Sequence, residues 1–180
     1  MRRLFLTALA VLPLAAALPI AAQAKPEAAA RVTPQSFAAD LVQHRMMEKA
    51  MANLAVTRSA TPEVRDFART ILTAAKADDA ELQAFAKAEG VAFQAPLSAQ
   101  NEAELTDLQG LATGPFDKYY ADYAARLDQD TLLTDSLATY SDTPAVAAYA
   151  RGHEPMLEDQ RVQAIQLYYD VGGARGMSFG

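Results

Sequence analysis

Cysteine is absent from this chain of 180 residues, and histidine occurs only twice. Without cysteine the chain forms no disulfide, no thiolate nucleophile and no cysteine-ligated zinc site. A glycine-rich phosphate-binding loop is also missing. These absences exclude several enzyme classes, and we expect no classical catalytic site.

Long stretches that alternate apolar and polar residues are also lacking, which argues against a β-sheet protein. Alanine is abundant instead, and glycine and proline fall mainly between segments with helical periodicity. The sequence therefore predicts an all-α protein. The helices are expected at residues 33–58, 61–90, 98–111, 116–140 and 144–170, the last bent near its internal proline.

The N-terminus has the features of a secretory signal. Arg2 and Arg3 precede an apolar run, residues 4–20, and Ala22-Gln23-Ala24 matches the small-residue pattern of a cleavage site. A retained membrane anchor is the alternative, but two prolines and the cleavage pattern favour removal near Ala24. We expect a mature protein in the periplasm or secreted from the cell.

The domain organisation follows from this assignment. Residues 1–24 form the signal peptide, residues 25–32 a flexible N-terminal tail, residues 33–173 one helical bundle domain, and residues 174–180 a flexible C-terminal tail. No later stretch is apolar enough to span a membrane.

The charge balance restricts the partners. The chain has 16 basic and 22 acidic residues, and loss of the two arginines of the leader gives the mature chain a net charge of −8. Because phosphates and anionic lipids would be repelled, we expect no nucleic-acid binding. An envelope protein or a small ligand is the expected partner.

One short motif occurs twice. Ser59-Ala-Thr-Pro-Glu-Val-Arg-Asp-Phe-Ala-Arg69 and Ser141-Asp-Thr-Pro-Ala-Val-Ala-Ala-Tyr-Ala-Arg151 are identical at six of eleven positions, at an offset of 82 residues. Each copy starts a helix after a tight turn. A good helix start used twice is one explanation, but we favour a repeated helical hairpin. Two hairpins joined by a crossover with a short helix predict a ferritin-like four-helix bundle.

Polar residues interrupt the apolar stripes that should face the core. In the helix at 116–140, the stripe predicted to face inward includes Phe116, Tyr120, Asp130 and Leu137. Counted from the hairpin turns, Glu48, Asp130 and His153 lie near mid-bundle, with three further polar residues about one turn away. These three are His44, Asp78 and Gln160.

Inward carboxylates and histidines hold metals in such bundles, so Glu48, Asp130, His153, His44 and Asp78 are candidate ligands for iron, manganese or zinc. The alternative is a structural layer of polar groups that satisfy one another. We favour that alternative, because no Glu-x-x-His motif of the usual di-metal bundle occurs.

The chain also resembles a family of exported bacterial proteins, domain of unknown function 4142, which is similar to ferritin-like bundles. The resemblance spans residues 37–167 and rests on short matches that occur in order. They include the Ser-x-Thr-Pro-Glu-Val motif leading into Phe67-Ala68, Glu81-Leu82 with Phe85-Ala86, Gly114-Pro115-Phe116-Asp117 with Tyr120, and Tyr149-Ala150 leading to Pro155-Met156-Leu157.

The departures from the family pattern concern its histidines. Where the resemblance leads us to expect an Asp-His pair and two further histidines, this chain has Ala74-Ala75, Asp128 and Gln160. If those histidines are metal ligands, as the resemblance suggests, Glu48 is the group retained. His44 and His153 stand at other positions.

Two classes of function follow. The first is an exported, non-catalytic binding, structural or stress-related envelope protein, one form of which would present a surface groove to another envelope component. The second is a metal-binding or metal-dependent redox protein built on the mid-bundle carboxylates and histidines.

Overall fold

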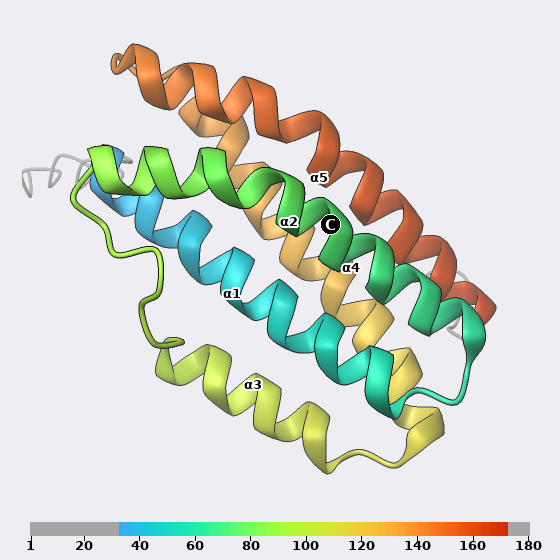
Figure 1. Ribbon diagram of the computed structural model, residues 1–180. Helices are drawn as coiled ribbons and strands as arrows, with labels where there is room; N and C mark the ends of the chain where they lie inside the picture. Colours follow the sequence, from blue (N-terminus) through green and yellow to red (C-terminus); the bar gives the residue numbers. More distant parts are fainter. Residues whose placement is uncertain (1–32, 173–180) are drawn as a thin grey trace, which may run out of the picture. The chain divides into compact units, whose positions relative to one another are not determined.

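The computed structural model describes residues 33–172, and every regular element in this part of the chain is an α-helix (Figure 1). This confirms the prediction of an all-α protein. The expected signal peptide, both tails and the end of the bundle domain at residue 173 lie outside the described residues. The helices are α1 (Pro34–Arg58), α2 (Pro62–Ala88), α3 (Ala99–Gly110), α4 (Thr113–Ala138) and α5 (Pro144–Asp170).

Local chemistry explains where the helices begin. The Thr33 hydroxyl accepts a hydrogen bond from the Ser36 backbone N–H at 3.0 Å and caps α1, and the Ser98 hydroxyl caps α3 in the same way. Proline starts α1, α2 and α5, where a missing N–H costs nothing. Just after α2, Gly90 has a φ of 73°, a conformation that favours glycine.

The repeated motif holds both hairpin turns through its serine. The Ser59 hydroxyl accepts a hydrogen bond from the Thr61 backbone N–H at 3.1 Å, and Ser141 accepts the equivalent bond from Thr143 at 3.2 Å. Neither threonine side chain caps its helix. The Thr61 hydroxyl instead donates to Asp117 at 2.6 Å, which ties the first turn to α4.

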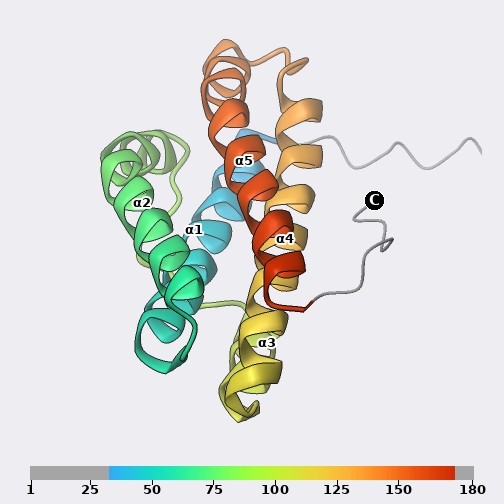
Figure 2. The same ribbon diagram turned by 90° about the vertical axis from the view of Figure 1, so that its right-hand side faces the viewer.

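The long helices form two hairpins. α1 packs along α2 and α4 packs along α5, while α1 also contacts α4, and α2 contacts α5 (Figure 2). The crossover between the hairpins contains α3, which packs on α1 and α4. Gln43 of α1 fastens the segment before α3, because its side chain bonds the Pro96 carbonyl and the Ser98 N–H.

Two apolar clusters lie along these helices, with a polar layer between them. Along α1, Phe37 and Leu41 belong to one cluster and Met47 and Met51 to the other, and the buried His44 lies between. On α2, α4 and α5, too, polar side chains lie between residues of one apolar cluster and residues of the other. The apolar clusters therefore enclose a layer of polar side chains that comes from all four long helices. Its members are His44, Arg45, Glu48, Asp78, Asp128, Thr131, Asp135, His153 and Gln160.

The inward face of α4 differs from the predicted one. Phe116 and Tyr120 are buried as expected, but Asp130 is exposed and Leu137 is 68% exposed. Polar residues take the inward positions in the second half of the helix: Asp128, Thr131 and Asp135. The face predicted for this second half was wrong, because the groups that it packs against, His44 and His153, are themselves polar.

Within residues 33–172, no helix combines the length and the apolar character needed to cross a membrane.

Arg58, in the last turn of α1, holds the end of α3. Its guanidinium donates to the Gln109 carbonyl at 2.5 Å and the Leu111 carbonyl at 2.8 Å, and it lies 5.2 Å from the ring centroid of Phe116. The cation thus binds carbonyls at a helix C-terminus, where positive charge is favourable.

We therefore expect Arg58→Ala to lower the free energy of unfolding by about 1–2 kcal/mol and to speed amide hydrogen exchange in α3. Arg69→Ala is the control, because the ion pair that Arg69 forms with Asp66 is exposed. This substitution should cost less than about 0.5 kcal/mol. Equal effects in denaturant unfolding would contradict this role of Arg58.

Candidate metal centre

Three buried side chains of the polar layer form a cluster with the chemistry of a metal site. His44 and Glu48 lie one turn apart on α1, and Asp128 lies on α4. Each offers a ligand atom, and these atoms all lie within 4.8 Å of one another. The cluster is the only one of its kind among residues 33–172.

Hydrogen bonds around His44 leave one ring nitrogen available. The Thr131 hydroxyl lies 2.7 Å from His44 Nδ1 and 3.0 Å from the Leu127 carbonyl. A hydroxyl has one proton, and we assign it to the bond with the carbonyl, since a carbonyl can only accept. Thr131 then accepts from Nδ1–H, and Nε2 keeps a lone pair. Metal-bound histidines show the same arrangement.

This Nε2 atom has no hydrogen-bond partner among the described residues. Asp128 Oδ1 lies 3.8 Å away from it, which is too far for a hydrogen bond. The lone pair therefore lies buried without a proton donor.

Glu48 is incompletely satisfied as well. Arg45 Nη1 lies 3.3 Å from Glu48 Oε2, close enough for an ion pair, but neither Glu48 oxygen has a partner with hydrogen-bond geometry. The stronger contact of this arginine is with Asp78, at 2.5 Å from Nη2 to Oδ2. Arg45 is only 1% exposed and is the cation of the polar layer. Arg45 therefore attracts the Glu48 carboxylate but leaves both of its oxygens without a hydrogen bond.

Burial shifts the cluster toward its uncharged forms. It is the main cause that raises the pKa of Glu48 to about 7, although Arg45 opposes the shift. Burial and the charge of Glu48 raise the pKa of Asp128 well above its usual range. The pKa of His44 is lowered well below 6.5, first by burial and then by His153 and Arg45. A neutral imidazole is the form that binds metal.

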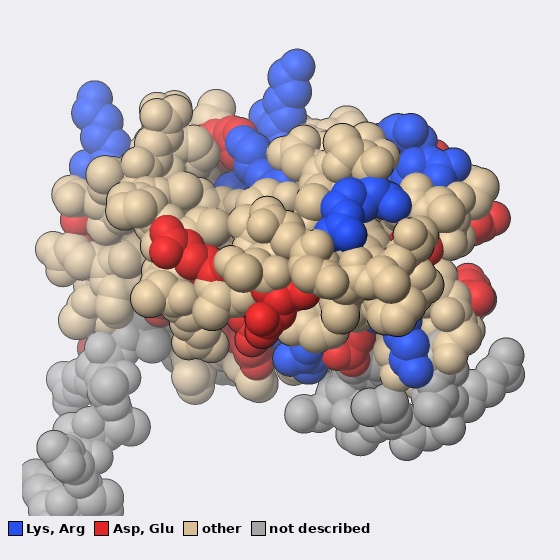
Figure 3. Space-filling model, turned by 90° about the horizontal axis from the view of Figure 1, so that it is seen from below, with Lys and Arg blue, Asp and Glu red and all other residues tan. Residues whose placement is uncertain are grey.

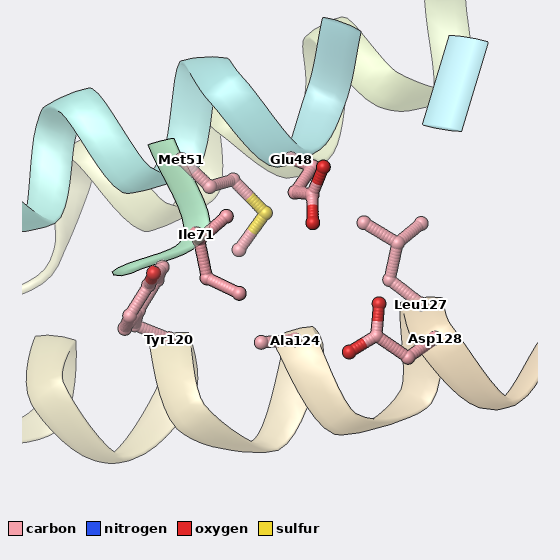
Figure 4. Close-up of a pocket in the computed structure, with 7 residues that line it drawn as sticks. All are labelled: Glu48, Met51, Ile71, Tyr120, Ala124, Leu127 and Asp128. Atoms are coloured by element: carbon pink, nitrogen blue, oxygen red, sulfur yellow. The ribbon is translucent and has the colours of Figure 1, made fainter. Parts of the chain in front are cut away.

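A small cavity separates the two carboxylates. Figure 4 shows Glu48 pointing from α1 and Asp128 from α4 into the same space, with Met51, Ile71 and Tyr120 on one side of it. The volume of about 10 Å³ suits one water molecule. The cluster therefore has room for one small species between its oxygens.

A wider groove approaches the cluster from outside. It has a volume of about 320 Å³, and its lining includes His44 and Thr131 as well as Asp40 and Asp130. His44 thus lines the groove and belongs to the cluster.

On the face in Figure 3, acidic and basic side chains are interspersed, and the basic ones form no continuous patch.

The candidate ligands predicted from the sequence divide into two groups. The structure brings His44 and Glu48 together. It does not bring Asp130, Asp78 or His153 to them as ligands: Asp130 is exposed, Asp78 pairs with Arg45, and His153 pairs with Asp135. Whether these three bind metal remains a prediction.

The third member of the cluster, Asp128, was not among the predicted ligands, although the sequence held a signal for it. It stands where the family resemblance leads us to expect a histidine. Gln160 stands at another such position, and its amide nitrogen and oxygen are buried without a partner among the described residues. Arg45 and Thr131 carried no comparable signal.

The raised pKa of Glu48 predicts a pH dependence of stability. Glu48 binds its proton more tightly in the folded chain, with a pKa of about 7, than at its ordinary value of 4.5. Its contribution to stability is therefore complete below pH 4.5 and is lost as the pH rises through 7.

Glu48→Gln should remove this loss. In chelator-treated protein, wild type should lose about 2–3 kcal/mol of unfolding free energy relative to Glu48→Gln when the pH is raised from 4.5 to 8. Denaturant unfolding at several pH values measures it. A difference that stays constant with pH would contradict the raised pKa.

Comparison with known proteins identifies the family. A family model described as "Domain of unknown function (DUF4142)" matches residues 18–167. Neither the comparison with curated proteins nor that with solved structures found a match. The family match covers most of the chain, including all three residues of the cluster. This chain therefore belongs to the DUF4142 family.

Proposed function

We propose that this protein binds one divalent transition-metal ion through His44, Glu48 and Asp128, in the core of an exported helical bundle. The observation that carries the proposal is the convergence of these ligand-capable atoms, all buried and within 4.8 Å of one another. The sequence favoured a purely structural layer of polar groups. Such a layer explains these atoms less well, because its polar groups should form hydrogen bonds with one another.

The unsatisfied atoms supply the main argument. Buried polar atoms almost always have a partner, and leaving one without costs about 1–3 kcal/mol. His44 Nε2 and both Glu48 oxygens have none among the described residues. All three can donate electron pairs, so one cation between them would satisfy them together. A single bound water, with two protons, would satisfy at most two.

The donor set limits the choice of metal. One imidazole nitrogen and two carboxylates suit zinc, iron(II) or manganese(II), whereas copper(I) prefers sulfur. Three protein ligands leave a coordination position for water, and the cavity beside Glu48 and Asp128 has room for one. The side chains need only small rotations to bring their atoms within about 2.0–2.2 Å of an ion.

The connectivity supports a ferritin-like bundle as part of this proposal. Two hairpins joined by a long crossover are the topology in which inward Glu and His side chains bind metals. The helix order and the packing of α1 on α4 are consistent with it. The departure is the ligand set, since a His-x-x-x-Glu pair on α1 stands in place of Glu-x-x-His.

Metal-induced stabilisation tests the site. Zinc or manganese at about 100 times its dissociation constant should stabilise the mature wild-type protein by about 3 kcal/mol, or about 10 °C in melting temperature. Elemental analysis should give one metal per chain. Glu48→Gln and Asp128→Asn should each lose the stoichiometric metal and most of the thermal shift.

Asp130→Asn is the matched control, because Asp130 lies two residues further along α4 but is exposed. It should keep both effects. If wild type shows neither metal nor a thermal shift, the polar layer is structural and the proposal fails. If Asp130→Asn loses the metal and Asp128→Asn keeps it, the site lies elsewhere.

Export is the second part of the proposal. It is supported by Arg2 and Arg3, the apolar run that follows and the Ala22-Gln23-Ala24 pattern. Expressed with its leader in a bacterium, the chain should be recovered outside the cytoplasm with Lys25 as its first residue, as intact-mass measurement would show. A protein that keeps Met1 and stays in the cytoplasm would refute export.

A further inference from the structure

A second polar pocket lies where α2 meets α5. Its volume is about 80 Å³, compared with about 10 Å³ for the cavity between Glu48 and Asp128, and the two share no lining residue. The residues that line it are Asp78, Glu81, Tyr149, Gly152, His153 and Met156. The pocket therefore needs an explanation separate from the first site.

His153 is the best-defined ligand group of this pocket. The side chain is only 6% exposed, and its Nδ1 lies 2.8 Å from Asp135 Oδ2. With Nδ1–H donating to this carboxylate, Nε2 carries the lone pair, and Nε2 is buried without a partner among the described residues. A carboxylate behind a histidine in this way orients the ring and fixes which nitrogen is free to bind a metal.

Met156 adds a sulfur ligand. It follows His153 by three residues on α5, so the two side chains lie on the same face of the helix, and both line the pocket. Nitrogen from imidazole together with sulfur from a thioether is a soft donor pair. Such ligands select copper(I) over magnesium, calcium or manganese.

The rest of the lining favours a cation. Asp78 and Glu81 bring carboxylates to the pocket, and only Asp78 has a cationic partner, Arg45, among the ion pairs of the described residues. Gly152 lies inside α5, where glycine costs about 1 kcal/mol relative to alanine. A Cβ there would meet no atom within 4 Å, so packing does not require this glycine. At this edge of the pocket the lining is the backbone of Gly152.

We propose that His153 and Met156 bind one copper(I) ion in the pocket between α2 and α5. Asp135 is the positioning residue for His153. This site differs from the first in its donors and its metal: one is built from nitrogen and oxygen, the other from nitrogen and sulfur. The two sites share no ligand.

The test is an anaerobic copper(I) titration of the mature protein against the chromophoric chelator bicinchoninate. Wild type should remove one copper(I) per chain from the chelator, and X-ray absorption should show a copper–sulfur contribution. Met156→Leu keeps the side-chain volume nearly constant. It should lose that contribution and bind at least tenfold more weakly, with its melting temperature little changed.

Two further variants make the result specific. Met47→Leu removes a thioether from the apolar core of α1, outside the pocket, and should bind copper(I) as wild type does. Asp128→Asn should also retain it, because Asp128 belongs to the first cluster. No stoichiometric copper(I) in wild type, or wild-type affinity in Met156→Leu, would overturn the proposal. If Asp128→Asn were the one variant that lost copper(I), the ion would lie in the first cluster, and the proposal would be overturned as well.

Discussion

Where α1 meets α4, burial deprives two carboxyl groups of water, and the polar layer around them must compensate for that loss. Glu48 and Asp128 lie where water has little access, and the pKa of each is raised chiefly for this reason. A buried charge is stable only when it is paired, bound to a metal or neutralised by a proton. Arg45 supplies one cation to the layer, but its short contact is with Asp78.

The two apolar clusters make such a layer tolerable. Phe37, Phe85 and Tyr149 pack as aromatic rings at one end, and Phe67, Phe116 and Tyr120 do so at the other. Their burial provides the stabilisation that offsets the polar middle, in a chain that has no disulfide. A core of this kind can keep ligand-capable groups unsatisfied without unfolding, and metal-binding sites need that property.

The sequence predicted the helices well because their ends carry local signals. Thr-Pro pairs, a serine cap and glycine placed most boundaries within about two residues, and the repeat correctly indicated two hairpins. The start of α4 is earlier than predicted, since Gly114 and Pro115 fall in its first turn, where an N–H is not needed.

The face of α4 could not be found in this way. Periodicity treats apolar residues as inward, but here Leu133 and Leu137 are more than half exposed, while Thr131 and Asp135 are buried. Those two polar residues contact His44 of α1 and His153 of α5, partners that lie far away in the sequence or on another helix. Polar contacts between helices decide which face of α4 is buried, and the sequence of a single helix does not show those contacts. For the same reason Asp130 was predicted at the position that Asp128 occupies.

Anomalous diffraction from crystals of the mature protein grown with manganese would locate the metal ion itself. We expect one strong anomalous peak between His44 Nε2, Glu48 and Asp128, with ligand distances of about 2.0–2.3 Å. Ordered water alone in this cavity, or a peak only at exposed carboxylates such as Asp130, would contradict it.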